Sequence, residues 1–163
     1  MPSHPEVTTQ TATPPRRINH AHVEWVGGKH FDAGRPGGGV ARFDSSGVTG
    51  PGPVDALLSA LAVCAAEDVI EILNKRRTPV EHLTIDAAGE RANEVPARLI
   101  GAKLTYHITG AGIDRANAER AVDLALGKYC SVRRSLDPTI PIEFAVTLNG
   151  EAGHLRPIGG VTP

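Results

Sequence analysis

The sequence predicts an α+β fold in which short strands accompany two helical segments. Three observations support this. Residues 54–76 repeat apolar side chains every three or four positions, as one face of a long helix does. Residues 82–88 and 97–109 alternate apolar and polar side chains, as half-buried strands do. A second helical pattern and a last strand-like run at residues 140–148 complete the order strands, helix, two strands, helix, strand.

Length and charge limit the number of domains and the class of function. The chain has 163 residues, which suits one domain. Its 17 Lys and Arg against 18 Asp and Glu give a formal net charge of −1, without the basic field that nucleic-acid binding requires. No apolar stretch reaches the roughly 20 residues of a membrane-spanning helix, and the first 17 residues lack the apolar core of a secretory signal. We therefore expect a cytoplasmic protein that binds neither nucleic acid nor membrane.

Composition along the chain predicts one folded domain between two tails. Residues 1–17 are rich in Pro, Thr and Ser and offer almost nothing to bury, so we interpret them as a disordered N-terminal tail. Residues 150–163 have a similar character and are expected to form a C-terminal tail. The domain itself is expected to span residues 18–149.

Strand signals open the domain and precede the long helix. Residues 20–26 mix β-branched and aromatic side chains, and the Gly-Gly pair after them marks a turn. A second short strand is expected at residues 40–43. The Gly-Pro-Gly-Pro run that follows breaks any strand and ends at Pro53, a favourable first residue for a helix.

Turn and cap signals organise the second half of the domain. The turn at residues 93–96 predicts that the two alternating runs form a hairpin. Asp114 is a good N-cap for the second helix, whose apolar residues continue on one face as far as Val132. We therefore expect antiparallel strands with the helices gathered on one side.

Two cysteines, Cys64 and Cys130, are the candidates for chemistry. Each lies at the edge of the apolar face of its predicted helix. Free cysteines usually behave as small buried apolar residues, so inert packing is one interpretation. The other is a redox pair, which needs half-exposed thiols on facing helices with Cα atoms about 4.4–6.8 Å apart. The sequence permits both.

Local charges predict unequal acidity for the two thiols. Glu67 and Asp68 follow Cys64 by three and four residues on the same helix, where anions oppose a thiolate. Two arginines occupy the same positions after Cys130 and favour a thiolate if the helix continues. Local sequence alone therefore predicts that Cys130 is the more acidic thiol.

The segments around both cysteines resemble a known family. Residues 52–69 (GPVDALLSALAVCAAEDV) resemble the first cysteine helix of the OsmC/Ohr family, which comprises the osmotically inducible protein C and organic hydroperoxide resistance proteins. Residues 128–132 (KYCSV) are similar to that family's second cysteine motif. The resemblance covers about residues 23–149 and is to the OsmC-like, YhfA-type branch rather than to Ohr itself.

The resemblance implies a fold and a chemistry. The implied fold is an intertwined homodimer in which antiparallel strands wrap around two long cysteine-bearing helices. The implied reaction is thiol-dependent reduction of an organic hydroperoxide, with Cys64 peroxidatic and Cys130 resolving. A Cys64 sulfenic acid condenses with Cys130, and an external dithiol, in this family a lipoyl protein, reduces the disulfide.

This chemistry needs no metal, haem or flavin cofactor. His20 and His22 lie two apart on a predicted strand, but no cysteine or carboxylate completes a metal-ligand spacing beside them. We therefore expect no metal site.

A reactive thiolate needs a nearby cation, and the family implies an arginine from the early strand–loop region with a carboxylate that orients it. The turn at residues 27–31 contains no arginine, so Arg35 and Arg42 are the candidates. Arg35 is preferred because it lies in a Gly-rich loop; a solvated loop charge is its alternative. Val54 stands where the family places the acid, and the neighbouring Asp55 is a candidate for that role or a stabiliser of the first helical turn.

Asp68 falls inside the apolar stripe of the long helix, where an unpaired charge is costly. A dimer-interface hydrogen bond or a partner such as His82 or His107 would satisfy it structurally. The alternative is a proton-handling role beside the first cysteine.

Three functional hypotheses follow. The leading one is a homodimeric thiol peroxidase acting on organic hydroperoxides. The second is a dimeric binding or stress-associated scaffold of the same fold without efficient peroxidase activity, motivated by Val54 and by the arginine missing from the turn. The third is a thiol-dependent enzyme with a different electrophile.

Overall fold

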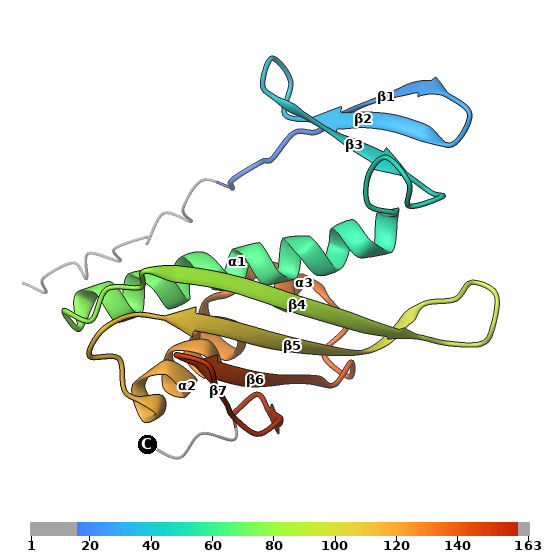
Figure 1. Ribbon diagram of the computed structural model, residues 1–163. Coiled ribbons are helices and arrows are strands. Elements are labelled where there is room, and N and C mark those ends of the chain that lie inside the picture. The colour runs from blue at the N-terminus through green and yellow to red at the C-terminus, as the bar shows by residue number, and fades with distance from the viewer. Residues whose placement is uncertain (1–15, 160–163) are drawn as a thin grey trace, which may run out of the picture.

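The computed structural model describes residues 16–159 and has two sheets connected by one long helix (Figure 1). The first sheet holds β1 (His22–Gly27), β2 (His30–Gly34) and β3 (Val40–Asp44). The long helix is α1 (Pro53–Lys75). The remaining elements are β4 (His82–Arg91), β5 (Leu99–Thr109), α2 (Arg115–Leu124), η1 (Ala125–Tyr129), α3 (Ser131–Ser135), β6 (Ile142–Leu148), β7 (Glu151–Ala152) and β8 (Arg156–Pro157).

The first sheet is an antiparallel meander in the order β1-β2-β3. The sequence predicted β1 and β3 but not β2, which pairs with both of them. Aromatic side chains align across it, with Phe31 opposite Trp25 on one side and Phe43 on the other. The sheet lies beyond the N-terminal end of α1, away from the rest of the chain (Figure 1), and nearly all of β1 is exposed.

Helix α1 begins at Pro53, as predicted, and runs for 23 residues. The carboxylate of Asp55 accepts a hydrogen bond from the backbone N–H of Gly52 at 3.0 Å, which satisfies one of the free donors of the first turn. The predicted apolar stripe is confirmed as the buried face of α1, which consists of Leu58, Leu61, Ala62, Ala65, Val69 and Leu73.

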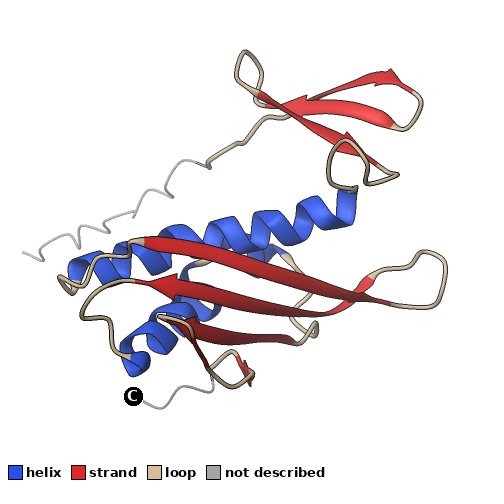
Figure 2. Cartoon of the chain, viewed as in Figure 1, coloured by secondary structure: helices blue, strands red, loops and turns tan. Residues whose placement is uncertain are grey.

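The second sheet has the order β4-β5-β6-β7, and the helices lie on one of its faces (Figure 2). β4 and β5 form the predicted antiparallel hairpin, with Ile85 opposite Tyr106. The expectation of antiparallel strands throughout is wrong, because β5 and β6 are parallel. Residues 115–135 carry the chain back across the sheet between these strands, and a parallel pair requires such a crossover.

The second cysteine segment is not the single long helix expected from the sequence. Helix α2 starts at its predicted cap, with Asp114 accepting from the N–H of Asn117 at 2.8 Å, but it ends at Leu124. A π-helical turn follows, closed by a hydrogen bond from the N–H of Cys130 to the carbonyl of Ala125 at 2.8 Å. Cys130 itself is extended, with φ −64° and ψ 109°. The wide turn therefore places Cys130 between two helical segments instead of on a helix.

Folded structure continues past residue 149, the expected end of the domain. β7 and β8 both pair with β6, and the Arg156 guanidinium lies 3.0 Å from the nearly buried carboxylate of Glu119 on α2. Part of the segment expected as a C-terminal tail is therefore bound to the domain. Most of the expected N-terminal tail, residues 1–15, lies outside the described residues, as do residues 160–163.

Candidate active site

Helix α1 presents Cys64 on the flank that faces the segment around residue 130. Cys64 is half-buried, and its Sγ lies 3.8 Å from Oγ of Ser131, the first residue of α3. The contact joins residues 67 positions apart in the chain. The thiol is thus held against the second cysteine segment while keeping contact with solvent.

Unlike Cys64, Cys130 has no contact with solvent, because it is fully buried within the core. Its Sγ accepts a hydrogen bond from the N–H of Arg133 at 3.3 Å and lies 4.0 Å from the carbonyl oxygen of Leu61 on α1. The sequence expectation of two half-exposed thiols on facing helices therefore describes Cys64 only. The Cys130 S–H donates to that Leu61 carbonyl, and the Cys130 thiol is also among the groups that lower the pKa of Cys64, so the two thiols act on each other.

The environment of Cys64 favours its thiolate. Burial by itself raises the pKa of the Cys64 thiol, but donors from the facing segment outweigh burial and lower it. These donors are, in order of effect, the N–H of Val132, the thiol of Cys130, and the hydroxyl and N–H of Ser131. Cys64 is therefore a partly exposed thiol whose pKa lies below its ordinary value.

The environment of Cys130 favours its neutral form. Burial raises the pKa of Cys130 to about 11, and the negative charge on Cys64 adds to the rise. The N–H of Arg133 acts in the opposite direction and is outweighed. The prediction from local charge, that Cys130 is the more acidic thiol, is therefore wrong.

The reason is that the helix does not continue through Cys130. The Arg133 guanidinium reaches the carbonyls of Asp137, Pro138 and Ile140 at 3.4 Å, and that of Arg134 reaches the carbonyl of Gly127 at 3.3 Å. Only the backbone of Arg133 contacts the sulfur.

Sequence reasoning missed three residues of this site. It quoted Ser131 and Val132 within the second cysteine motif and placed Val132 on the apolar face of the second helix, but it gave neither a role in the chemistry. A helix beginning just after Cys130 is the signal that identifies their N–H groups as free donors. Tyr106 of β5 was not singled out. Its hydroxyl is buried without a hydrogen-bond partner in the described part of the chain, and burial first, then the charges on both cysteines, raises the pKa of its phenol.

The other predicted site residues are not brought to Cys64 within this chain. Arg35 lies in the exposed loop after β2 and makes no side-chain hydrogen bond or ion pair with residues 16–159. Arg42 is paired in a bidentate contact with Asp32 across β2 and β3. Asp55 caps the first turn of α1, nine residues before Cys64. No arginine is among the groups that shift the pKa of Cys64.

Asp68 is half-buried on α1 and lacks the partners proposed for it. His107 instead lies 2.9 Å from Asp86 across β4 and β5. Within residues 16–159, Asp68 forms no hydrogen bond or ion pair, and burial, followed by repulsion from Glu71 and Glu67, raises its pKa.

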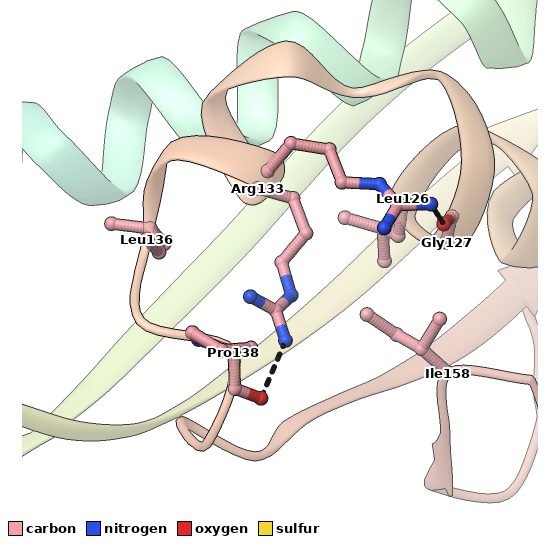
Figure 3. Close-up of a pocket in the computed structure, with 7 residues that line it drawn as sticks. Leu126, Gly127, Arg133, Leu136, Pro138 and Ile158 are labelled. Atoms are coloured by element: carbon pink, nitrogen blue, oxygen red, sulfur yellow. Dashed lines mark hydrogen bonds between the residues drawn. The ribbon is translucent and has the colours of Figure 1, made fainter.

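A pocket of about 330 Å³ lies on the far side of the second cysteine segment (Figure 3). Leu126, Leu136, Pro138 and Ile158 supply apolar walls, and the two arginine side chains cross it. Neither cysteine lines this pocket, so it does not give access to the thiol pair.

Within residues 16–159, no three His, Cys, Asp or Glu side chains gather as a metal site would require. None of the helices in residues 16–159 is long and apolar enough to span a bilayer.

Comparisons with known proteins show the family and the fold to which this chain is similar. The OsmC-like protein family model matches residues 44–145. Protein YhfA of Escherichia coli (strain K12) is 35% identical over 123 residues, which cover 75% of this chain and 92% of YhfA. An OsmC-like protein from Mycoplasma pneumoniae superposes with a TM-score of 0.69 at 18% identity, over 81% of this chain and 97% of that one. An organic hydroperoxide resistance protein OsmC from Legionella pneumophila superposes with a TM-score of 0.60 at 16% identity, and the match covers 82% of this chain and 98% of that one. The chain therefore belongs to the OsmC-like protein family.

Proposed function

We propose that the protein is a two-cysteine thiol peroxidase that reduces organic hydroperoxides. The observation that carries the proposal is the contact between a half-exposed Cys64 with a lowered pKa and a buried Cys130 thiol with a raised one. A peroxidatic cysteine must be ionised and reachable, and a resolving cysteine must lie beside it. The fold shared with an organic hydroperoxide resistance protein supports this reaction class.

The reaction has three steps. The Cys64 thiolate attacks the terminal oxygen of the hydroperoxide, so that an S–O bond forms, the O–O bond breaks and the alcohol leaves. The thiol of Cys130 then attacks the Cys64 sulfenic acid, forming a disulfide and releasing water. An external dithiol finally reduces the disulfide and is itself oxidised.

Burial determines which sulfur the reductant reaches. Cys130 is fully buried whereas Cys64 is not, so the incoming thiolate attacks the Cys64 sulfur and Cys130 is the leaving group. A lipoyl protein, whose dithiol sits on a long arm, is the reductant that we propose from the family resemblance.

We also propose that two copies of the chain form the functional unit. Val63 and Ile70 on the outer face of α1 are 59% and 37% exposed and line an apolar groove with Leu83 and Ile85 of β4. The first sheet, with Trp25 65% exposed, buries almost nothing against its own chain. A small sheet is stable only when it packs a face against another element. A second copy supplies that element if the first sheet of one chain covers the groove of the other.

This dimer offers a place for Arg35. The loop after β2 belongs to the projecting sheet, and Asp55 lines a groove beside the apolar one, with Ser59, Ile85 and Asp86. We propose that Arg35 of one chain stabilises the thiolate of the other. Asp55 lies nine residues before Cys64, about 180° around α1, and caps the first helical turn instead of orienting this arginine.

Thiol counting tests the peroxidase proposal. Reduced protein mixed with cumene hydroperoxide should lose two thiols per chain. Cys130→Ser should stall with one thiol oxidised to a sulfenic acid that dimedone traps, and Cys64→Ser should not react. Catalytic consumption of peroxide by Cys64→Ser would overturn the assignment of the nucleophile.

The second candidate is an OsmC-fold binding or scaffold protein without efficient peroxidase activity. It is favoured by one observation: within residues 16–159 of a single chain, no arginine contributes to the acidity of Cys64. Thiols that stay unchanged at millimolar hydroperoxide would favour this second function over the first.

A further inference from the structure

Asp68 lies beside Cys64 on the flank of α1 that faces the second cysteine segment. Asp68 is four positions after Cys64, so the two side chains are about 40° apart around the helix and one turn apart along it. Helical side chains lean toward the N-terminus, so Asp68 leans toward Cys64. The facing segment runs alongside: Ser131 contacts Cys64, and Tyr129 is close enough to influence Lys75 of α1. Asp68 lies between these two contacts.

Lys75 is the cation in residues 16–159 that lowers the pKa of Asp68, and its ammonium is paired with another carboxylate. Lys75 lies 2.6 Å from Glu71, and Lys128 stacks 5.3 Å over the ring of Tyr129. His107 is paired with Asp86. Burial raises the pKa of the Asp68 carboxyl, the charges of Glu71 and Glu67 raise it further, and the charge of Lys75 opposes them but is outweighed.

A hydroperoxide reduction needs a proton at this place. Attack by the Cys64 thiolate on the terminal oxygen leaves the inner oxygen as an alkoxide, a strongly basic leaving group. The donors identified around Cys64 all point to the sulfur and stabilise the thiolate before the reaction. The Asp68 carboxyl, one helical turn away and with a raised pKa, is the group on this flank that can donate to the second oxygen.

We propose that Asp68 is the general acid that protonates the departing alcohol, an inference that rests on the proposed peroxidase function. As the S–O bond forms and the O–O bond breaks, the Asp68 proton moves to the alkoxide oxygen, giving the alcohol and an Asp68 carboxylate. The hydrogen of the terminal peroxide oxygen stays on the sulfenic acid. Asp68 recovers its proton from solvent before the next turnover.

Leaving groups of different basicity test the proposal in single-turnover stopped-flow measurements. tert-Butyl hydroperoxide expels an alkoxide that needs a proton, whereas peracetic acid expels acetate, which does not. Asp68→Asn should lower the rate constant for tert-butyl hydroperoxide about 100-fold and that for peracetic acid by less than about threefold. Glu94→Gln is the control, because Glu94 is an exposed acid that shifts the pKa of neither Cys64 nor Asp68, and it should change neither rate by more than about threefold.

Alkylation separates proton donation from thiolate formation. Iodide leaves without a proton, so Asp68→Asn should alkylate with iodoacetamide at least as fast as the wild type. An equal loss of rate with both peroxides and with iodoacetamide would show a structural role and overturn the proposal, as would full activity of Asp68→Asn toward tert-butyl hydroperoxide. A wild type inert to both peroxides would instead overturn the peroxidase function itself, and this inference with it.

Discussion

At the scale of single residues, the difference between Cys64 and Cys130 comes from what surrounds each sulfur. Cys64 receives donors from Ser131, Val132 and Cys130, whereas burial dominates at Cys130. The acidic neighbours Glu67 and Asp68, which the sequence makes conspicuous, are not among the groups that shift the pKa of Cys64. Hydrogen bonds made directly to the sulfur therefore outweigh charges one helical turn away.

This difference predicts two separate alkylation profiles. Iodoacetamide reacts with the thiolate, so the rate of each cysteine rises as the pH passes through its pKa. Cys64 should titrate below the ordinary thiol value, and Cys130 near pH 11 or only on unfolding. Mass spectrometry of protein labelled at pH 7 should find the label on Cys64, with Cys64→Ser as the control. Preferential labelling of Cys130 would contradict the assignment.

At the scale of elements, the turn between η1 and α3 creates the donors of the site. If one helix ran from Asp114 through Val132, the N–H groups of Ser131 and Val132 would bond carbonyls one turn earlier. The π-helical turn and the extended Cys130 start a new helix at Ser131, and the first N–H groups of a helix have no partner within it. These free donors are directed at Cys64.

Removing the Ser131 hydroxyl tests how much the start of α3 contributes to the acidity of Cys64. Ser131→Ala should slow alkylation of Cys64 at pH 7 about two- to fivefold, because a hydrogen bond to the thiolate of ordinary net strength is lost. Ser135→Ala is the matched control, since this hydroxyl of the same helix donates to the carbonyl of Ser131 instead. Equal rates for Ser131→Ala and the wild type would show that the backbone N–H groups suffice.

At the scale of the whole molecule, the exposed apolar surface is concentrated on the first sheet and on the outer face of α1. The two regions belong to elements adjacent in the chain that nevertheless pack little against each other (Figure 1). Proteins rarely leave such surfaces in water, and they usually mark an interface.

Sedimentation should therefore find a particle of twice the chain mass of 17.1 kDa. Val63→Glu should weaken the dimer about 100-fold or more, because a charge in an apolar interface loses its hydration without a partner. Arg120→Glu, an exposed charge change on α2, should leave the mass unchanged. A monomeric wild type would refute the proposed assembly and the supply of Arg35 by a partner.

The repeated apolar patterns and the helix-start signals of the sequence predicted most of the fold. The apolar spacing of α1, its start at Pro53, the Asp114 cap and the alternation in β4 and β5 are local patterns that local geometry suffices to interpret. The short strand β2 escaped prediction because its five residues include a charge and a terminal glycine. The parallel pairing of β5 with β6 also escaped, since strand direction depends on how the intervening chain crosses the sheet.

The sequence by itself determined the family, the order of the principal elements and the two cysteines that matter, because these reside in residue identity and spacing. Only the tertiary structure decided which thiol is acidic, since acidity depends on donors 66 or more positions away and on burial that no local window contains. It also left Asp68 without a hydrogen bond or ion pair in residues 16–159, because Lys75 pairs with Glu71 and His107 lies against Asp86.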